Sequence, residues 1–352
     1  MQTKDFHFDL PEELIAQQPC AERGQDRLLC LDRTTGKVSD HLFSDIVSLI
    51  EPGTLMVFND SRVRRARIFP TVEASGSTAE FLLISAIAVS GALPGTVWKV
   101  MAKNAKRQKA GRTYVFPDGT HALLREGGDE FAHTEFRLLE FDHPIDDTWL
   151  ELFGHLPLPP YIHRGDELSD AERYQTVFSR NIGSVAAPTA GLHFTPDLLS
   201  ALDARGIERT AVTLHVGLGT FLPVRAEQIE DHVMHEESYA VSAESAERVN
   251  RAKREGRPVL AVGTTSIRTL ESAWDAERNE LRRGEGSTRI FMYPGYEFKV
   301  VNRVFTNFHT SESTLLMLVS AFAGRETIMS AYAHAIEMKY HFFSYGDSML
   351  IV

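Results

Sequence analysis

The sequence predicts an α/β fold: an α/β/α sandwich with a mainly parallel sheet, plus an inserted small antiparallel β-barrel domain. Between about residues 65 and 145, short β-type runs follow one another without a long helical pattern. After residue 156, strand-type and helix-type segments alternate, which is typical of a parallel sheet covered by helices. We therefore expect 1–62 to be the first part of the α/β domain, 63–150 the inserted β-barrel domain and 151–352 the second part of the α/β domain.

Local signals mark the starts and stops of individual elements. Thr195 is placed to cap a helix that Gly206 ends. In the insert, PDG (117–119) is a hairpin turn signal. The other expected elements are a strand ending at 59, a strand over 208–217, a helix over 242–256, strand, turn and helix over 257–277, helices over 313–324 and 326–340, and a last strand over 347–352.

The charge of the chain limits its possible partners. The 352 residues carry a formal net charge of −11, which argues against indiscriminate nucleic-acid binding. Two stretches are nevertheless basic, RVRRARI (62–68) and KVMAKNAKRQKAGR (99–112). Each is either a solvated loop that balances acidic residues elsewhere or part of a specific RNA footprint.

The compartment is predicted from cysteines and apolar segments. Cys20 and Cys30 are too few for a disulfide framework, which favours the reducing cytoplasm. The N-terminus lacks the pattern of a secretory signal. The apolar stretch 81–93 is shorter than the ~20 residues of a membrane-spanning helix, so we expect no membrane association.

Polar side chains and glycines gather where predicted strands end, which is where open α/β sheets bind ligands. The first such segment is NDSR, with Asn59, Asp60 and Arg62, for which an Asx-turn is the alternative. The second is GSVAAPTAGLHFT (183–195), whose small residues let a ligand approach the backbone, unless it is simply a packed connection.

The segment HVGLGTF (215–221) places two glycines at the end of a predicted strand, where backbone N–H groups are exposed to an anion. It lacks the third glycine of a dinucleotide fingerprint, and the chain has no Walker-type Gly-Lys-Ser/Thr. Neither nucleotide motif therefore explains these glycines.

The segment HVMHEESYAV (232–241) offers His232, His235 and Glu237 as metal ligands only if they share a helical face. Because ESYAV begins a strand, we favour a general base or a ribose-hydroxyl acceptor from Glu236 or Glu237, with a plain surface turn as the alternative. No metal is expected.

Two more segments join a strand to a helix. In AVGTTSIRTLES (261–272) the helix start directs N–H groups at its ligand, with Arg268 one turn in, which suits a carboxylate or phosphate. In TNFHTSES (306–313), Asn307 and His309 end a strand, and Ser311 or Ser313 caps the following helix. The chain has no nucleophile elbow and no Cys–His pair suited to thiol catalysis, so covalent hydrolase chemistry is weakly supported.

In this order the motifs closely resemble the S-adenosylmethionine:tRNA ribosyltransferase-isomerase family of the queuosine pathway. The resemblance covers nearly the whole chain and is weakest in the insert. It runs from FHFDLPEELIAQQP (6–19) through NDSRV, LPLPPYI, GSVAAPTAGLHFT, HVGLGTF, HVMHEESY, AVGTTSIRTLES and TNFHTSESTLLMLVSAFAG to FFSYGDSMLI (342–351). It implies two domains, an α/β/α sandwich with an inserted small β-barrel.

The resemblance also implies a reaction. The family transfers and isomerises the ribosyl moiety of S-adenosylmethionine onto 7-aminomethyl-7-deazaguanine at the wobble position of tRNA, and the products are epoxyqueuosine-tRNA, adenine and methionine. For this chain it implies S-adenosylmethionine as co-substrate, tRNA with a modified guanine-type wobble base as partner, and a cytoplasmic monomer.

Such a reaction needs a base that removes a proton beside the sulfonium, and a donor that helps adenine leave. With the family reaction in view, our candidates for the base are His215, His193 and Glu237, in that order. Asp60 or His235 is the candidate donor.

The same view assigns the binding residues. The helix start with Arg268 is expected to hold the methionine carboxylate, and Phe221 or Phe194 to face the sulfonium or adenine. HVGLGTF then becomes a close-approach floor under S-adenosylmethionine. The expected cofactor-binding set is Asn59, Arg62, Thr189, Gly217, Gly219, Thr220, Phe221, Gly263, Thr264, Thr265 and Arg268.

One departure and two alternatives complete these expectations. Thr310, Ser311 and Glu312 stand where the family pattern has Leu-Pro-Lys, so a negative charge replaces a positive one. The alternative functions are an α/β enzyme that uses a nucleoside cofactor on a small molecule, and a non-catalytic RNA-binding module. Charge reversal in 99–112 distinguishes tRNA modification from the small-molecule enzyme, because only tRNA modification should need these basic side chains.

Overall fold

The computed structural model describes residues 1–127, 134, 136–217, 219 and 224–352. The chain divides into two compact units, Met1–Arg62 with Pro159–Val352, and Val63–Leu158. The expected boundary at 150 falls inside helix α2 (Asp147–Phe153), and the chain returns to the first unit after residue 158.

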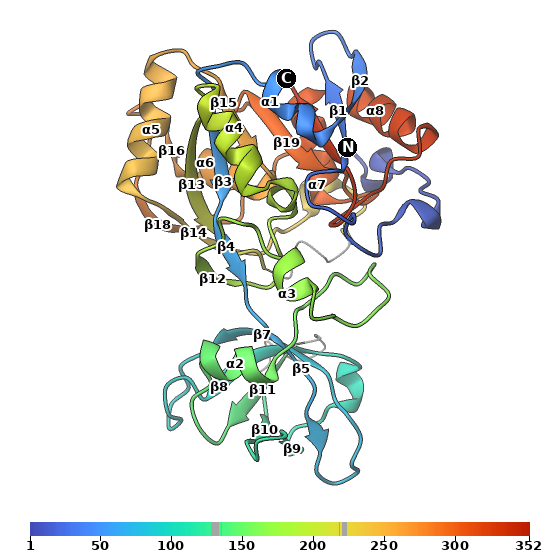
Figure 1. The fold of residues 1–352 in the computed structure, drawn as a ribbon. Coiled ribbons are helices and arrows are strands. Elements are labelled where there is room, and N and C mark those ends of the chain that lie inside the picture. The colour runs from blue at the N-terminus through green and yellow to red at the C-terminus, as the bar shows by residue number, and fades with distance from the viewer. Residues whose placement is uncertain (128–133, 135, 218, 220–223) are drawn as a thin grey trace. The chain divides into compact units, whose positions relative to one another are not determined.

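The first unit is built on a large mixed sheet (Figure 1). In spatial order its strands are β18 (Gly284–Thr288), β14 (Glu237–Val241), β13 (Glu208–Leu214), β3 (Leu55–Asn59), β15 (Val259–Val262), β19 (Arg303–Asn307), β20 (Ser348–Ile351), β1 (Arg27–Leu31) and β2 (Val38–Leu42). Strands β13, β3, β15 and β19 are mutually parallel, as are β20 and β1.

The expectation of a mainly parallel sheet is wrong, because the pairs β18–β14, β14–β13, β19–β20 and β1–β2 are antiparallel. The physical reason at β20 is the connection. Two consecutive helices, α7 (Thr314–Ala323) and α8 (Arg325–Glu337), pack together between β19 and β20. A single crossover helix returns the chain to the opposite end of the sheet, so the next strand is parallel. A pair of helices returns the chain to the end at which the previous strand stopped, so the next strand is antiparallel.

Each face of the sheet has its own core. Along β3, Leu55 and Val57 pack into one cluster while Met56 and Phe58 pack into the other, as the alternation of side chains along a strand requires. The first cluster includes residues of α5 (Ala243–Arg254), α6 (Thr264–Ala273), α7 and α8. The second includes residues of α1 (Ile46–Leu49) and α4 (Pro196–Ala204).

The local helix signals are confirmed. The Thr195 hydroxyl accepts a hydrogen bond from the N–H of Leu198 at 3.1 Å, and α4 ends before Gly206, which has φ +75°. Ser313, one of the two expected caps, accepts from the N–H of Leu316 at 3.1 Å.

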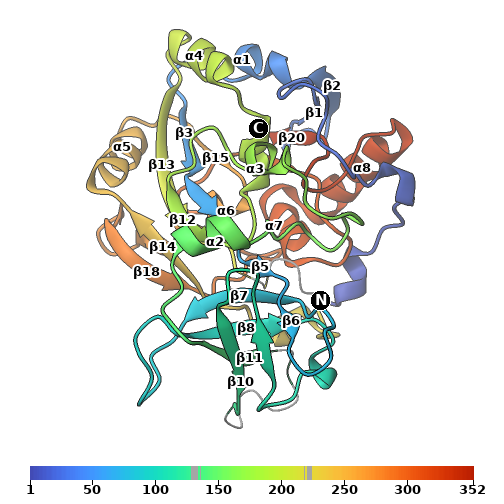
Figure 2. The ribbon, with the colours of Figure 1, turned by 60° about the horizontal axis from the view of Figure 1, so that its bottom comes forward.

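The second unit is a curled antiparallel sheet, seen in Figure 2. Its strand order is β5 (Arg67–Ile68), β7 (Phe81–Ala86), β8 (Val97–Ala102), β11 (Phe136–Phe141), β10 (His121–Arg125), β9 (Thr113–Val115) and β6 (Thr71–Val72). The edge strands β5 and β6 are consecutive in the chain, so the sheet bends back toward its own beginning. The predicted hairpin at PDG joins β9 to β10.

The remaining elements are short. They are β4 (Ser61–Val63) paired with β12 (Asn181–Ser184), β16 (Trp274–Asp275) paired with β17 (Glu280–Leu281), helix α3 (Asp170–Arg173) and the 3-10 turns η1 (Thr3–Phe6), η2 (Glu12–Leu14), η3 (Phe43–Asp45), η4 (Ala105–Arg107), η6 (Thr189–His193) and η8 (Ile229–Asp231). Within the described ranges, no helix combines the length and apolar character needed to cross a membrane.

Candidate active site

A pocket in the first unit lies at the ends of β15 and β19. Its lining includes Gly263, Thr264 and Thr265 after β15, and residues 306–310 at the end of β19. The other sides come from Ala186, Ala187, Pro188, Thr189, Ala190, Val216, Tyr161, Tyr174, Leu315, Phe343 and Ser344. Because β13, β15 and β19 run in the same direction, the segments that follow them meet at one edge of the sheet.

The start of α6 forms one wall of this pocket. Gly263 has φ +83°, which favours glycine, and a Cβ there would lie 3.5 Å from the Cβ of Ala190. The first N–H groups of a helix have no partner within the helix. The hydroxyl of Thr265 is buried, and the described residues give it no hydrogen-bond partner. This wall therefore offers several hydrogen-bonding groups to a ligand.

A smaller second pocket adjoins the first, since Leu315 lines both. It contains a buried ion pair between Arg268 of α6 and Glu237 of β14, with side-chain exposures of 6% and 3%. Glu237 also accepts a hydrogen bond from the N–H of Gly217 at 2.8 Å. The Nε and Nη2 atoms of Arg268 are buried, and the N–H groups of these two nitrogens have no partner among the described residues.

Gly219 and His235 belong to the same small pocket. A Cβ at Gly219 would lie 2.8 Å from the His235 ring, so only glycine allows this approach. His232 lines the pocket too, and burial followed by the nearby His235 lowers the pKa of His232. In the part of the chain that the structure describes, no three His, Cys, Asp or Glu side chains converge as a metal site would require.

The NDSR residues lie outside the pocket lining. The Asn59 amide is used within the fold, because its Nδ2 donates to the Leu214 carbonyl at 3.0 Å and its Oδ1 accepts from the Leu214 N–H at 3.1 Å. The Asp60 carboxylate accepts from Thr213 at 2.6 Å and from Asn181 at 3.0 Å. Arg62 lies on β4. That Asp60 or His235 acts as the donor that helps adenine leave stays a prediction.

His215 follows β13 and is half-buried. Its ring lies against Gly183, where a Cβ would be 2.6 Å from the His215 Nδ1. Its neighbour Val216 lines the pocket, whereas His215 does not. Of the other residues in this segment, Thr220 and Phe221 lie outside the described residues.

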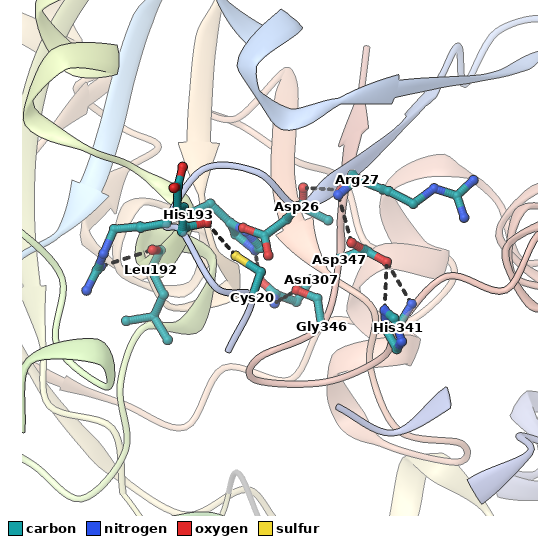
Figure 3. Close-up of polar contacts among 12 residues, drawn as sticks. Cys20, Asp26, Arg27, Leu192, His193, Asn307, His341, Gly346 and Asp347 are labelled. Carbon is teal, nitrogen blue, oxygen red and sulfur yellow. Dashed lines mark hydrogen bonds and ion pairs between the residues drawn. The ribbon is translucent and has the colours of Figure 1, made fainter. Parts of the chain in front are cut away.

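His193 lies behind the pocket in a buried polar network (Figure 3). Its Nδ1 is 2.7 Å from the Asp26 carboxylate, and its Nε2 is 3.3 Å from the Oδ1 of Asn307. The Asn307 Nδ2 donates to the carbonyls of Phe343 at 2.9 Å and Gly346 at 3.5 Å. Asn307 lines the pocket, so it connects the pocket wall to the histidine.

The network indicates the protonation state of His193. Because the Asn307 amide nitrogen donates to carbonyls, its Oδ1 is the acceptor, and the His193 Nε2 must carry a proton. Nδ1 likewise donates to the Asp26 carboxylate. Burial alone would lower the pKa of His193, but the Asp26 charge and the hydrogen bonds from Asp26 and Asn307 outweigh it and raise the pKa. An imidazolium with both N–H groups engaged cannot accept a proton from a substrate.

Asp26 is the buried counterpart of His193. Burial tends to raise the pKa of Asp26, but the charge of His193 and its hydrogen bond lower it below its usual range. Beside this pair, burial and then Asp26 raise the pKa of the Cys20 thiol to about 11. In the same region, Asp347 accepts from the backbone N–H groups of Arg27 and His341 at 2.7 Å each.

Phe194 does not reach the pocket, contrary to its expected contact with a ligand. It is fully buried and packs edge-on against Phe43, Phe58 and Phe305 in the core. The small residues that precede Phe194 in the sequence gave no indication that its ring packs in this aromatic cluster.

Asp26 was missed as a site candidate. Asn307 and His309 were singled out at the end of a predicted strand but were given no role, and both line the pocket. For Asp26 the sequence offers no signal, because its partner lies 167 positions away. The divergent turn 310–312 is held by the N-terminal segment, with the Ser311 hydroxyl accepting from the Phe8 N–H at 3.0 Å and Glu312 lying 3.0 Å from His7.

The two basic stretches differ in the second unit. Three arginines of 62–68 form ion pairs, Arg64 with Asp147, Arg65 with Glu151 and Arg67 with Glu80. In 99–112, by contrast, Lys106, Arg107 and Lys109 are exposed on and beside η4, and no acidic partner is found for them among the described residues. Lys103 of the same stretch pairs with Glu80, so the uncompensated positive charge that the described residues show is that of these three side chains.

The sequence profile of a family described as queuosine biosynthesis protein matches residues 3–351. The chain belongs to this family. A relative from Treponema denticola, named S-adenosylmethionine:tRNA ribosyltransferase-isomerase, is 56% identical over 352 residues, with all of both chains covered. A relative of the same name from Acetivibrio thermocellus is 48% identical, again over the full length of both.

A solved structure is also similar to this queuosine biosynthesis protein. It is the S-adenosylmethionine tRNA ribosyltransferase from Thermotoga maritima, with a TM-score of 0.55 and 32% identity, covering 99% of this chain and 100% of that one. The family resemblance predicted from the sequence motifs is thus confirmed, and the chain is an enzyme of the transferase class.

For this queuosine biosynthesis protein we expect the Asp26–His193 pair to control the pH dependence of stability. Because the folded pKa of His193 is raised, its contribution is complete below the unfolded value near 6.5 and is lost as pH rises through the folded pKa. Asp26→Asn should remove this decline and lower the free energy of unfolding at pH 6 by about 3 kcal/mol. Chemical denaturation across pH 5–9 measures both effects.

Asp9→Asn is the matched control, because it removes a carboxylate 3.3 Å from another histidine, His7, in an exposed pair. It should leave the stability profile unchanged. An Asp26→Asn profile that keeps the wild-type slope would contradict the assignment of His193 as an imidazolium.

Proposed function

We propose that the chain transfers and isomerises the ribosyl moiety of S-adenosylmethionine onto 7-aminomethyl-7-deazaguanine at the wobble position of tRNA. The products are epoxyqueuosine-tRNA, adenine and methionine. Full-length similarity to relatives named for this activity is the observation that carries the proposal. The pocket at the strand ends supports it, because its lining combines aromatic rings and small residues with neutral hydrogen-bonding groups, as a nucleoside requires.

We infer further that the first unit is an α/β/α sandwich and the second a small β-barrel. The two-sided core of the large sheet and the curl of the second sheet support this description. We also infer a cytoplasmic monomer, consistent with Cys20 and Cys30 remaining free thiols. Light scattering of the purified protein tests the monomer, and a dimer mass would contradict it.

In the proposed complex, the amino-acid end of S-adenosylmethionine lies at the start of α6 and at Arg268. The helix start supplies N–H groups and partial positive charge, and Arg268 supplies two buried N–H positions without protein partners among the described residues. Thr189, Gly217 and Gly219 belong to the same region by position. Glu237 holds Arg268 and the Gly217 backbone, so we assign it a positioning role in place of the base.

We retain His215 as the proposed base. It follows β13 immediately before Val216, which lines the pocket, and imidazole is the side chain that most often serves as a general base. The other two candidates are committed to charged partners, His193 to Asp26 and Glu237 to Arg268. Removal of a proton beside the sulfonium then sets off the loss of adenine.

The proposed function is tested by adenine release from S-adenosylmethionine, with and without tRNA that bears the aminomethyl-deazaguanine base. We expect release that depends on this tRNA, with a matching mass gain on the tRNA. Lys106→Glu/Arg107→Glu/Lys109→Glu should lower kcat/KM for tRNA on the order of 100-fold, because three phosphate-contacting charges are reversed. Binding of S-adenosylmethionine alone should not change.

Arg278→Glu/Arg282→Glu/Arg283→Glu changes the net charge equally at exposed arginines of the first unit and controls for a general charge effect. Release on small molecules without tRNA would favour a nucleoside-dependent enzyme of another kind. Tight tRNA binding with no adenine release would favour a non-catalytic RNA-binding module.

Arg268→Lys is expected to raise KM for S-adenosylmethionine by at least about tenfold. Lysine keeps a positive charge beside Glu237 but loses the planar fork, whose Nε and Nη2 atoms have no partner among the described residues. Steady-state kinetics with saturating tRNA measures the effect. The control is Arg248→Lys, since Arg248 pairs with Glu244 on the surface of α5. Equal KM values in the two variants would exclude Arg268 as a ligand-binding residue.

His215→Asn should stop exchange of the protons beside the sulfonium with deuterated solvent, with a loss on the order of 100-fold. The amide cannot act as a base at neutral pH, although it retains hydrogen-bonding groups. Mass spectrometry of recovered S-adenosylmethionine measures the exchange. His334→Asn on α8 is the control, and undiminished exchange in His215→Asn would transfer the role of base to another residue.

A further inference from the structure

His309 is a pocket residue that the proposed mechanism does not use. It follows β19, lines the pocket and is 8% exposed. Its backbone N–H donates to the Tyr332 hydroxyl at 2.8 Å, and its Nε2 lies 3.1 Å from the Thr306 hydroxyl. These contacts fix the ring from the protein side. Among the described residues, Nδ1 has no hydrogen-bond partner.

The surroundings of the His309 ring favour its neutral form. Burial lowers the pKa of His309 to about 3. The pocket lining contains no Asp, Glu, Lys or Arg within the described part of the chain, so no neighbouring carboxylate compensates this burial. His309 thus differs from His193, which is equally buried but faces Asp26. A neutral ring also avoids placing a second positive charge beside a sulfonium.

A neutral imidazole carries one N–H donor and one acceptor nitrogen. The Thr306 hydroxyl can supply its proton to Nε2, and the proton of the ring then lies on Nδ1. In that tautomer His309 presents a single N–H donor to the pocket. The donor belongs to a rigid part of the wall, because the neighbouring Phe308 is buried against Tyr332, Tyr340 and Phe342.

We propose that His309 is a catalytic residue that donates a hydrogen bond from Nδ1 to N3 or N7, the ring nitrogens that flank the ribosyl-bearing N9, in the adenine of S-adenosylmethionine. The proposal rests on the proposed function and deepens it. The uncharged pocket fits a neutral purine, with Tyr161 and Phe343 offering aromatic surface. The charged Arg268 and Glu237 lie in the adjoining pocket, which fits the amino-acid end of the same molecule.

The hydrogen bond contributes when adenine leaves. The bond between the ribosyl carbon and adenine breaks, and its electron pair moves onto the purine. A donor already in place stabilises this developing charge without reorganisation. The proton remains on His309, so no proton transfer from the imidazole is required.

Two substitutions separate this contact from a structural role. The amide of Asn reaches the position of Nδ1, whereas the amide of Gln reaches that of Nε2. His309→Asn should therefore keep the contact with adenine, and His309→Gln should keep the contact with Thr306. We expect kcat for adenine release to fall on the order of 100-fold in His309→Gln and less than about tenfold in His309→Asn. A structural role through Thr306 gives the reverse order.

The decisive experiment compares wild type and His309→Gln on S-adenosylmethionine and on its 3-deaza and 7-deaza adenine analogues, with the modified tRNA present. If Nδ1 donates to one of these nitrogens, the ratio of wild-type to variant kcat should collapse toward one on the analogue that lacks it. A ratio that stays the same on both analogues overturns the proposal.

Equilibrium binding of S-adenosylmethionine and thermal unfolding of each variant show whether it is folded. If His309→Gln unfolds, His309→Asn with the same analogues carries the test, because it should retain the analogue sensitivity of the wild type. Absence of adenine release by the wild type overturns the proposed function itself. Wild-type release with an unaffected His309→Gln overturns only the role of His309.

Discussion

The pocket wall of the first unit depends on the buried amide of Asn307. This side chain is 2% exposed, and a buried amide must find partners for its donors and its acceptor. The partners of the Asn307 amide lie in two separate segments, His193 of η6 and the turn from Phe343 to Gly346. Because Asn307 is also the last residue of β19, one amide joins the sheet edge to two loops that line or support the pocket.

The partners of Asn307 decide the orientation of its amide. An amide can be turned by exchanging its oxygen and nitrogen, and only the partners decide between the two arrangements. The carbonyls of Phe343 and Gly346 can only accept, so the Asn307 Nδ2 faces them and its Oδ1 faces the Nε2 of His193. Burying the charge of His193 is costly in desolvation, and its contacts with Asp26 and Asn307 offset that cost.

Features that depend on neighbouring residues were predictable from the sequence, and features that depend on distant partners were not. Thr195 and the glycine turn at Gly263 carry their information within a few positions, and the structure contains both the cap and the turn. The pairing of Asp26 with His193 and of Glu237 with Arg268 joins different segments, so no local pattern announces it. The same limit applies to sheet direction, because the pair α7 and α8 reverses β20.

The charges of the two basic stretches also depend on partners that are distant in the sequence. From the sequence alone, the basic stretches 62–68 and 99–112 are equally suited to bind phosphate groups. Only the fold places Asp147, Glu151 and Glu80 beside the arginines of the first stretch. The same principle operates around the pocket: the cation of His193 is compensated by Asp26 and that of Arg268 by Glu237. In the complex that we propose, the sulfonium meets two cations already paired with carboxylates, while the ligand carboxylate meets N–H groups of Arg268 that have no partner among the described residues. Compensated cations of this kind allow one pocket region to accept a ligand that carries both charges.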